Sequence, residues 1–279
     1  AIMLHPTFVA MATNGVTTFD VFGIPCNVQN YSSTVLPIIL SVWVMSYVES
    51  FFSKVLPSSL RGVFGPALTI LVMLPITLCV LGPAGSYLGN YITTGLMAFG
   101  KLTGAFGLAV VTALYPILVI TGMHMVLITA LFQVFATVGF DGAIAPALTI
   151  SAFAIMGVGI GAYLRLKDKD QKGQAAEFAI TAILAGTSEP TLYGICMRYK
   201  RPFIGLLGGG FLGGLYCGIT GVISATLVPA TNFTSILCFT GADLANIVNG
   251  AIGCGIALVA TVLLVYFFGF DKDEPAIQK

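Results

Sequence analysis

The sequence has very little charge. Only 8% of its 279 residues are Asp, Glu, Lys or Arg, whereas 57% are hydrophobic, and an average soluble domain carries about 25% charge. So few charged side chains cannot cover a soluble globule of this length. The 12 basic and 11 acidic residues give a net charge of +1, so no basic excess points to nucleic acid. We therefore predict an integral membrane protein with no nucleic-acid partner.

The sequence also lacks every paired-cysteine motif. Its six cysteines stand singly and none belongs to a C-x-x-C pair, so the pattern indicates neither a disulfide framework nor a zinc site. Five of them lie in or beside apolar runs, where a thiol behaves as a small hydrophobic side chain. We therefore expect no metal and no cofactor.

The chain begins without methionine, a basic segment or a cleavage-site pattern. Its first residues, AIMLHPTFVAMAT, do not form a signal peptide. They are typical of the last turns of a membrane helix. We therefore expect the chain to be truncated at this end.

Long apolar runs fill most of the chain, and a membrane-spanning helix needs about 20 mostly apolar residues. The segments that meet this requirement are Val35–Phe52, Val63–Leu81, Ala105–Met123, Ala143–Leu164, Phe203–Val228 and Gly250–Phe270. Met125–Phe140 and Ala175–Cys196 are weaker candidates, and polar linkers are expected at Thr13–Ser33 and Pro229–Asn249. The predicted fold class is an all-α integral membrane protein, a multi-span helical bundle.

The basic residues predict how these spans are oriented, because cytoplasmic loops near membrane ends are enriched in Lys and Arg. The basic sites are Lys54 with Arg61, Arg165–Lys172, Arg198–Arg201 and the C-terminal tail. Placing them all inside requires Ala175–Cys196 to enter and leave the membrane on one face. We therefore predict a cytoplasmic C-terminus and a re-entrant hairpin over about residues 175–197, with its tip near Gly186–Pro190. A non-helical tip at membrane depth must be buried by protein or line a watery cavity, and transporters bind substrates at such places.

Glu189 is the most informative residue of this hairpin. Its carboxylate stands in LAGTSEPTLYG, inside an apolar run, where a charge costs about 2.5–3.5 kcal/mol at mid-membrane. Gly186 permits a turn and Pro190 removes a backbone donor, so the helix should break and free backbone polar groups. The carboxylate and these groups together suit the hydroxyls of a polyol. The alternative is a structural Glu paired with a buried Lys or Arg, but the apolar surroundings offer few such partners.

His124 is the second candidate. It follows LYPILVITGM at the end of a predicted span, and an imidazole can donate, accept or transfer a proton near neutral pH. A lone histidine on an apolar face is more often a packing residue, so spacing alone leaves both interpretations open. The presence of Glu189 as another ionisable group at membrane depth favours a functional role.

A basic cluster follows the predicted hairpin. Arg198, Lys200 and Arg201 in RYKR could hold an anionic partner or a phosphate, but an ordinary cytoplasmic loop explains them better from sequence alone. The glycines of Gly205–Gly214 lack the G-K-[ST] of a phosphate loop and lie inside a span. We interpret them as residues of close helix packing.

Several motifs resemble a known family. GTSEPTLYGICMRYKRPF (Gly186–Phe203) is similar to the hairpin signature of enzyme IIC, the sugar permease domain of the bacterial phosphotransferase system, in the β-glucoside branch of its glucose superfamily. Tyr31–Pro57 and Leu118–His124 resemble two further motifs of that branch, and AIMLHP resembles the end of its third helix. The resemblance covers essentially the whole chain.

The resemblance implies a function and the residues that carry it. The chain would bind a sugar, a β-glucoside or related disaccharide, and translocate it. It would then present the sugar to the phosphocysteine of a IIB domain, which receives its phosphoryl group through IIA and the general phosphotransferase proteins. The family's hairpin glutamate falls on Glu189 and its motif histidine on His124. Either could accept or relay the proton of the sugar hydroxyl, with Gly186, Thr187 and Ser188 beside them. The basic cluster would lie on the phosphate side.

The resemblance also implies an architecture. Residues 1–104 would be the N-terminal part of the IIC domain, with scaffold helices for a homodimer and the first helices missing. Residues 105–279 would be the transport part that holds the sugar. The protein would cross the bacterial inner membrane several times. Because the chain lacks the phosphocysteine motif of IIB and the phosphohistidine domain of IIA, it would be the membrane component of a sugar phosphotransferase, inactive without IIB.

The sequence departs from the family pattern near the expected sugar site. MVLIT follows His124 where the family continues with W-G and a proline, Pro116 stands where Gln is frequent, and Ser188 where Thr is common. These departures leave the sugar open. An ion-coupled secondary sugar transporter is one competing class, and dependence on phosphoenolpyruvate separates it from a permease of the phosphotransferase system. A membrane sensor that binds sugar and regulates a partner is the other, and its function would survive the loss of transport in Glu189→Gln.

Overall fold

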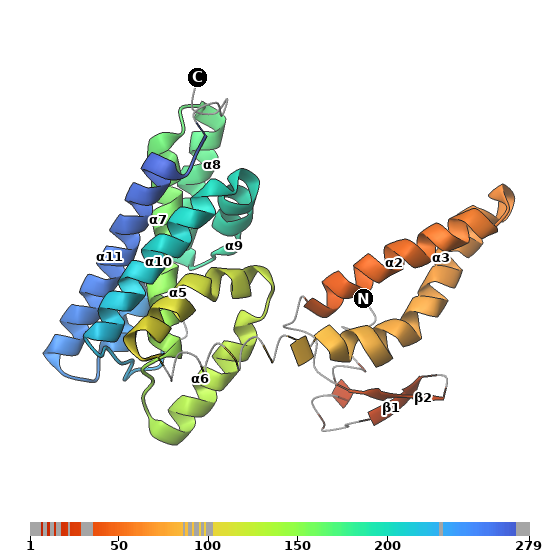
Figure 1. The fold of residues 1–279 in the computed structure, drawn as a ribbon, viewed down its shortest axis with the longest axis horizontal. Coiled ribbons are helices and arrows are strands. Elements are labelled where there is room, and N and C mark those ends of the chain that lie inside the picture. Colours follow the sequence, from red (N-terminus) through yellow and green to blue (C-terminus); the bar gives the residue numbers. More distant parts are fainter. Residues whose placement is uncertain are drawn as a thin grey trace. The chain divides into compact units, whose positions relative to one another are not determined.

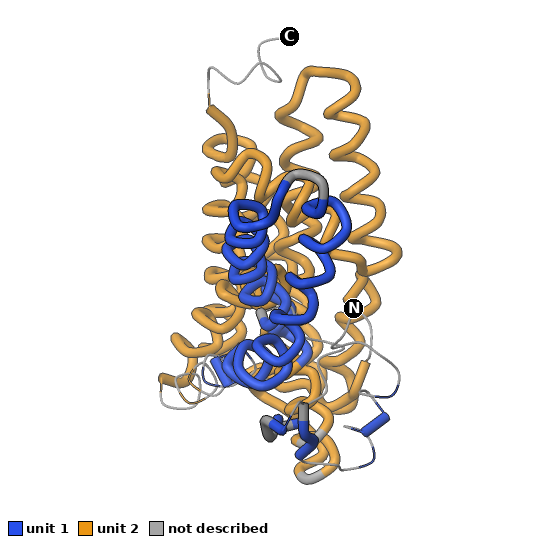
Figure 2. The backbone as a smooth tube through the Cα atoms, turned by 90° about the vertical axis from the view of Figure 1, so that its right-hand side faces the viewer, with its two compact units in different colours: residues 1–94, 121–125 blue, residues 95–120, 126–279 orange. Residues whose placement is uncertain are grey.

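The chain forms two compact units. Residues 1–94 with 121–125 make the first, and residues 95–120 with 126–279 make the second (Figure 2). The computed structural model describes residues 7, 10–11, 14, 18–21, 23–28, 36–85, 87–88, 91, 95, 98, 103–228 and 231–271. Each unit has a hydrophobic cluster of its own.

The first unit contains a short β-hairpin. β1 (Thr18–Val21) pairs antiparallel with β2 (Ile24–Asn27), and Gly23 in the turn takes a φ of 81°, which glycine adopts without strain. The sequence analysis made this stretch a polar linker, because two strands of four residues are too short to show a clear alternation.

A disulfide in the first unit corrects the cysteine expectation. Cys26 of β2 is bonded to Cys79, and Cys26 packs with Phe19, Leu74 and buried Leu78. The two cysteines are 53 residues apart, so no local motif announces their pairing. The apolar setting of Cys79 was predicted correctly, whereas Cys26 lies in the stretch predicted as a polar linker. The approach of the two thiols depends on how the helices and the strands fold together.

Two antiparallel helices make up most of the described part of the first unit. α2 (Leu36–Val55) is followed at once by α3 (Ser58–Pro75), which continues as a π-helical segment, η2 (Ile76–Leu81) (Figure 1). No side chain in the apolar window of α2 is buried, and large ones such as Trp43, Tyr47 and Phe51 are exposed. Such a helix needs lipid or another protein chain around it.

The second unit is a helical bundle built around α7 (Figure 1). Its long helices are α5 (Ala105–Ile120), α6 (His124–Val138), α7 (Ile144–Arg165), α8 (Lys169–Ile180), α10 (Arg201–Ile219) and α11 (Leu244–Phe268). Short elements are η3 (Thr181–Ala185), α9 (Glu189–Thr191), η4 (Leu192–Met197) and η5 (Phe233–Phe239). α7 is buried along 89% of its apolar window and contacts α5, α8, α10 and α11.

Glycines let these helices approach closely. A Cβ atom at Gly213 of α10 would lie 2.7 Å from the Cβ of Ala257 and 2.7 Å from the carbonyl oxygen of Gly253, both on α11. A Cβ at Gly157 of α7 would lie 2.7 Å from the carbonyl oxygen of Leu258. The interpretation of the glycine run as helix packing is confirmed by these contacts.

The membrane fold class is confirmed, with changes at the ends of spans. Five helices of the described residues are long and apolar enough to cross a membrane, and α5 with α6 forms a further candidate bent by 119°. The span predicted to reach Met123 ends at Ile120, because Gly122 takes a φ of 71°. The span predicted to reach Val228 ends at Ile219, where Gly221 takes a φ of 65°.

The predicted linker between the last two spans is partly structured. η5 occupies its middle, and α11 begins at Leu244, six residues before the predicted Gly250. Asp243 caps α11 by accepting a hydrogen bond from the Asn246 N–H at 3.0 Å, a favourable start for a helix. Hydropathy alone missed this first turn, because its side chains include polar asparagine.

Candidate functional site

Residues 169–199 fold back on themselves as a hairpin on the second unit. One limb is α8 with η3, and the returning limb is α9 with η4 (Figure 1). At the base, the Tyr199 hydroxyl donates a hydrogen bond to Oε1 of Gln171, so both ends of the hairpin meet. The π-helical segments η3 and η4 flank the tip, and π-helical turns are frequent at functional sites. Insertion of the hairpin into a membrane stays a prediction.

The tip of this hairpin turns at Gly186. Gly186 has a φ of 73°, and a Cβ there would lie 2.8 Å from the backbone nitrogen of Asn232. Only glycine meets both conditions without strain. The expected helix break therefore lies between Ala185 and Glu189, where α9 starts.

The loop between α10 and α11 fastens the tip through two hydrogen bonds. The Thr231 hydroxyl donates to the Gly186 carbonyl at 2.7 Å, and Nδ2 of Asn232 donates to the Leu184 carbonyl at 3.0 Å. These bonds satisfy two carbonyls that the broken helix leaves open. Sequence reasoning missed Thr231 and Asn232, because they lie about 45 residues from the tip in a segment predicted as linker. Their one signal is the polar cluster TNFTS between two apolar runs.

A small cavity lies beside the tip. It holds about 20 Å³, room for one water molecule, and its lining includes Tyr115, Gly186, Ser188 and Thr231. The Glu189 side chain is exposed, and its carboxylate interacts electrostatically with buried Tyr115. Two predicted site residues, Gly186 and Ser188, therefore line this cavity together with Tyr115 of α5, and Glu189 follows Ser188 in the chain.

The hydroxyls of the tip stand next to the carboxylate. The Ser188 hydroxyl donates to Oε2 of Glu189 at 3.4 Å, and the Thr187 side chain is exposed. Among the described residues, the carboxylate makes no ion pair with Lys or Arg. This exposed acceptor beside the hydroxyls of the tip is suited to a polyol ligand.

His124 is the first residue of α6 and is partly buried. The chain breaks before it over Thr121–Met123, where Gly122 has the positive φ. The segment 121–125 packs as part of the first unit, whereas Glu189 belongs to the second. A joint site of His124 and Glu189 therefore stays a prediction.

Another hydrogen bond ties the hairpin to the end of α5. The Tyr193 hydroxyl on the returning limb donates to the Ile120 carbonyl at 3.1 Å. Ile120 is the last residue of α5, just before the break that precedes His124. Tyr193 was not among the predicted site residues, and nothing in its local sequence reveals this partner 73 residues away.

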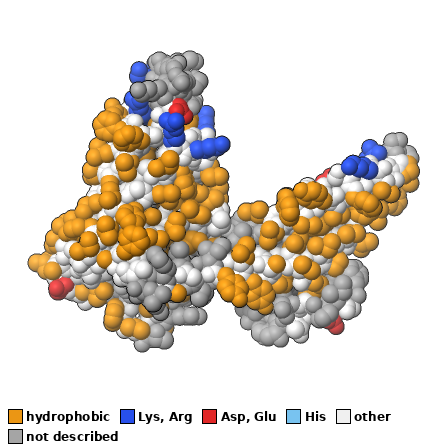
Figure 3. Space-filling model, in the orientation of Figure 1, with side chains coloured by type: hydrophobic (Ala, Val, Ile, Leu, Met, Phe, Trp, Pro, Cys, Tyr) orange, Lys and Arg blue, Asp and Glu red, His pale blue; other side chains and the backbone are white. Residues whose placement is uncertain are grey.

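The basic cluster lies at the end of the second unit where the hairpin begins and ends (Figure 3). Arg201 pairs with Asp271 at 2.5 Å, and the Arg198 guanidinium lies 5.2 Å from the ring centre of Tyr199. Lys200 has an exposed side chain and a positive φ of 63°. Arg198 and Lys200 thus have exposed charges, while Arg201 is paired with Asp271.

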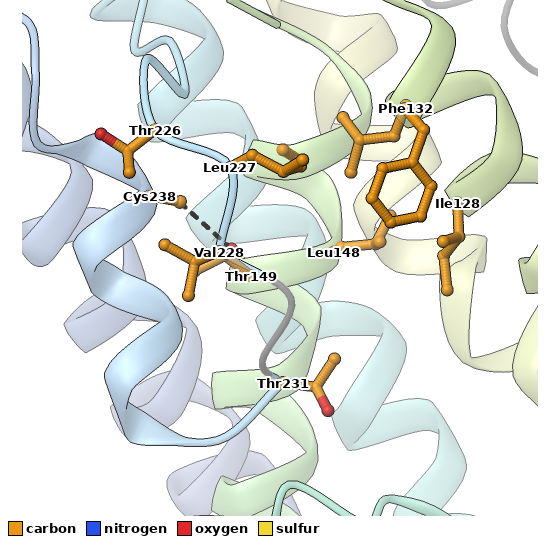
Figure 4. A pocket seen from close by; sticks show the side chains of 11 residues that line it. Ile128, Phe132, Leu148, Thr149, Thr226, Leu227, Val228, Thr231 and Cys238 are labelled. Carbon is orange, nitrogen blue, oxygen red and sulfur yellow. Dashed lines mark hydrogen bonds between the residues drawn. The ribbon is translucent and has the colours of Figure 1, made fainter. Parts of the chain in front are cut away.

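A larger cavity, which sequence reasoning did not anticipate, lies between α6, α7 and the loop after α10 (Figure 4). It holds about 140 Å³ and is lined mainly by apolar side chains, among them Ile128, Phe132, Leu148 and Leu227. Thr231 lines this cavity as well as the small one at the tip.

Comparison with known proteins gives one family. The family model described as "Phosphotransferase system, EIIC" matches residues 1–210. The arbutin-, cellobiose-, and salicin-specific EIIBC component of Escherichia coli (strain K12) is 29% identical over 99% of this chain and 58% of its own length. The β-glucoside-specific EIIBCA component of Bacillus subtilis (strain 168) is 32% identical over 100% of this chain and 46% of its own length.

A third relative has a different stated sugar. The glucose-specific EIIBCA component of Corynebacterium glutamicum is 32% identical over 98% of this chain and 40% of its own length. The chain thus spans about half the length of the curated relatives it matches. No solved structure matches the chain.

Proposed function

We propose, from the premise that this chain belongs to the EIIC family of the phosphotransferase system, that it binds a sugar and presents it for phosphorylation by a IIB domain. The sugar we propose is a β-glucoside or a related disaccharide. The stated specificities of the Escherichia coli and Bacillus subtilis relatives support this choice. The relatives named EIIBC and EIIBCA support IIB and IIA as partners.

The observation that carries the proposal is the hairpin tip. Glu189 stands at the start of α9, next to Ser188 and the break at Gly186. A carboxylate accepts hydrogen bonds from sugar hydroxyls, and the hydroxyls of the tip offer further partners. The hydrogen bonds that Thr231 and Asn232 donate to the tip support the proposal that the tip stays in place while the substrate binds.

The proposed chemistry is positioning together with help for one proton. Phosphoryl transfer needs the attacking hydroxyl in line with the phosphorus, and most of the catalysis comes from orientation and charge. The hydroxyl forms a bond to phosphorus, the bond from phosphorus to the sulfur of IIB breaks, and the hydroxyl proton leaves. Glu189 or His124 accepts that proton, and Gly186, Thr187 and Ser188 hold the sugar beside it.

The basic end of the second unit is the proposed cytoplasmic face. Arg198 and Lys200 are exposed there, and positive residues at one end of spanning helices favour the inside. On this orientation the C-terminus is cytoplasmic, and phosphorylated IIB approaches the end where the hairpin is rooted. The exposed apolar side of α2 supports a homodimer through the N-terminal part, residues 1–104.

The test uses the complete protein with its IIB domain in membrane vesicles. Phosphoenolpyruvate and the general phosphotransferase proteins are supplied, and labelled β-glucosides, sucrose and glucose are screened for phosphorylated product. We expect product from one class of sugar, reduced at least about 100-fold in Glu189→Gln, because general bases contribute about that much or more. His124→Ala is expected to fall in the same direction.

Glu177→Gln is the matched control. Glu177 is an exposed glutamate on α8, in the same hairpin, and its substitution should leave the product rate within about twofold of wild type, as for most surface changes. Uptake of unmodified sugar that follows an ion gradient and ignores phosphoenolpyruvate would overturn the proposal and favour a secondary transporter. Equal losses in Glu177→Gln and Glu189→Gln would show that Glu189 has no special role.

A further inference from the structure

Tyr115 of α5 is a polar residue buried beside the hairpin tip. It is only 4% exposed, and it lines the small cavity together with Gly186 and Ser188 of the tip. A tyrosine combines a large apolar ring with one hydroxyl, and a buried hydroxyl normally has a polar partner. The polar groups that share the cavity with Tyr115 therefore bear on what its hydroxyl does.

A hydrogen bond fixes α5 along the returning limb of the hairpin. The Tyr193 hydroxyl donates to the Ile120 carbonyl at 3.1 Å, and this carbonyl belongs to the last turn of α5, where no intrahelical partner remains. Tyr193 lies one helical turn after Glu189 on this limb, and Tyr115 lies in the same helix as Ile120. The bond therefore keeps Tyr115 in place beside the start of the limb, where Glu189 stands.

The small cavity has the volume and the polar residues that one water molecule needs. It holds about 20 Å³, whereas a water needs roughly 10–15 Å³ and about two to four polar partners. Its lining includes three side chains with a hydroxyl, Tyr115, Ser188 and Thr231. Ser188 donates to Glu189 and Thr231 donates to the Gly186 carbonyl, so both oxygens can still accept from a water. A phenol hydroxyl both donates and accepts, so that of Tyr115 can bond a water in addition to another partner.

The Ser188 hydroxyl extends this set of polar groups to the carboxylate of Glu189. It donates to Oε2 of Glu189 at 3.4 Å, and the phenol of Tyr115 interacts electrostatically with the same carboxylate. A water between Tyr115 and Ser188 completes a hydrogen-bonded chain from α5 to Glu189. A carboxylate held by such a chain keeps one orientation, and a group that is already oriented loses less entropy when a ligand binds.

We infer that one water molecule binds in the small cavity between the hydroxyls of Tyr115 and Ser188, and that Tyr115 is thereby a positioning residue for Glu189. The inference rests on the proposed function, in which Glu189 contacts the sugar, and it adds a residue of α5 to that site. Tyr115 acts through the water and Ser188 and does not itself contact the sugar. The competing interpretation is that Tyr115 only packs beside the tip.

The first measurement is equilibrium binding, which does not depend on phosphorylation. Arbutin, cellobiose and salicin, three β-glucosides, are titrated into the purified complete protein by calorimetry, and the sugar that binds most tightly is used throughout. Tyr115→Phe removes only the phenol hydroxyl. It should weaken binding of that sugar about threefold to tenfold, because the carboxylate of Glu189 loses a hydrogen-bonded chain that orients it.

A double-mutant cycle separates positioning from packing. Ser188→Ala removes the link between the water and Glu189, so Tyr115→Phe added to Ser188→Ala should change the Kd for the sugar less than about twofold. If Tyr115 only packs beside the tip, the loss caused by Tyr115→Phe is the same with and without Ser188. Equal losses in the two backgrounds would therefore overturn the inference.

Filling the cavity tests the water itself. Ala152 of α7 lines the cavity and is 7% exposed, and Ala152→Val adds two carbon atoms there while every hydroxyl stays. Displacement of the water should weaken sugar binding about as much as Tyr115→Phe does, and the two changes together should cost no more than about twofold beyond either alone. Wild-type binding by Ala152→Val would show that no water links Tyr115 to Ser188.

Tyr216→Phe is the matched control. The Tyr216 hydroxyl donates to Oδ1 of Asn249 at 3.0 Å and so joins α10 to α11, and Tyr216 does not line the small cavity. Its loss removes one phenol hydroxyl from the same unit and should leave the Kd for the sugar within about twofold of wild type. If Tyr115→Phe also stays within twofold, Tyr115 does not position Glu189 and the inference is wrong.

The phosphorylation assay keeps the two proposals apart. If the binding losses follow the expected cycle but no sugar yields phosphoenolpyruvate-dependent product, the proposed function fails and the water stands as part of a sugar-binding site. If product forms and Tyr115→Phe binds and reacts like wild type, the proposed function stands and the inference fails. Failure of all three β-glucosides to bind the wild type would remove the sugar site on which the inference rests.

Discussion

In the core of the second unit, α7, α10 and α11 approach one another over glycines, and the limbs of the hairpin of residues 169–199 pack closely on α7. The tip of the hairpin, in contrast, is fastened to the loop after α10 by two side-chain hydrogen bonds. At Gly213 even one added carbon atom would meet α11 at 2.7 Å. At the tip, by contrast, Thr231 and Asn232 each contribute one side-chain bond. Close packing of the helices stabilises the core, whereas a few hydrogen bonds hold the tip against the loop.

The difference indicates which part can move. A closely packed interior resists a change of one methylene group, so α7, α10 and α11 form a rigid support. A hydrogen bond contributes only about 0.5–1.5 kcal/mol net, so two such bonds hold the tip in place for sugar binding but let it leave the loop at small cost. A permease needs this combination, because the substrate must be gripped on a fixed frame and then released.

The largest effect is expected from filling the core interface. Gly213→Val adds three carbon atoms where the first already lies 2.7 Å from Ala257 and Gly253, and overpacking of this kind costs about 1–3 kcal/mol or more. We expect the yield of monodisperse protein after detergent extraction to fall at least about tenfold, measured by size-exclusion chromatography.

Gly255→Val is the control for this change. Gly255 is on α11, and a Cβ there meets nothing within 4 Å, so the yield should stay within about twofold of wild type. A normal yield of Gly213→Val would show that α10 and α11 can separate, and would remove the contrast between core and tip.

The next effect is expected at the turn of the hairpin. Gly186→Ala forces an L side chain into a φ of 73° and places a Cβ 2.8 Å from the nitrogen of Asn232, a strain of order 1–3 kcal/mol. We expect normal yield but a phosphorylation rate reduced at least about tenfold, because the tip no longer seats against the loop. Gly173→Ala on α8, where a Cβ meets nothing within 4 Å, should leave the rate unchanged. A Gly186→Ala protein with full activity would show that the tip geometry is not needed.

Sequence reasoning succeeded where the signal is local. Apolar length located the spanning helices, and the glycines of α10 showed their packing role because they lie inside a span. Gly186 with Pro190 marked the break, and the structure places Gly186, Ser188 and Glu189 around it. Each of these inferences depends on residues that are neighbours along the chain.

Sequence reasoning failed where the signal is a contact between distant segments. Cys26 and Cys79 are 53 residues apart, and Thr231 is 45 residues from Gly186, so neither pairing leaves a local pattern. The larger cavity is likewise made by α6, α7 and the loop after α10 together. Packing of the whole unit decides such contacts, and one sequence carries no direct record of them.

A moderate effect is expected from one of the two bonds that fasten the tip. Thr231→Val keeps the shape of the side chain and removes the hydroxyl that donates to the Gly186 carbonyl at 2.7 Å. The loss of about 0.5–1.5 kcal/mol should raise the KM for the sugar about threefold to tenfold in the vesicle assay, with yield unchanged.

Thr220→Val is the matched substitution. The Thr220 hydroxyl bonds carbonyls of its own helix end, those of Tyr216 and Cys217, so its loss should not change the KM. If Thr231→Val and Thr220→Val give the same KM, the loop does not hold the tip in place for sugar binding.

The smallest effect is expected at the basic end of the second unit, where an exposed ion pair joins the first residue of α10 to Asp271, which follows α11. Arg201 and Asp271 lie 2.5 Å apart with side chains 51% and 57% exposed, and exposed pairs contribute about 0–1 kcal/mol. Asp271→Ala should therefore lower the thermal midpoint less than Asp243→Ala, which removes the cap of α11 and costs about 1 kcal/mol. Both variants are measured by thermal unfolding in detergent. If Asp271→Ala is the more damaging, the ion pair clamps the basic end, and Arg201 is then a structural residue rather than one available to an anionic partner.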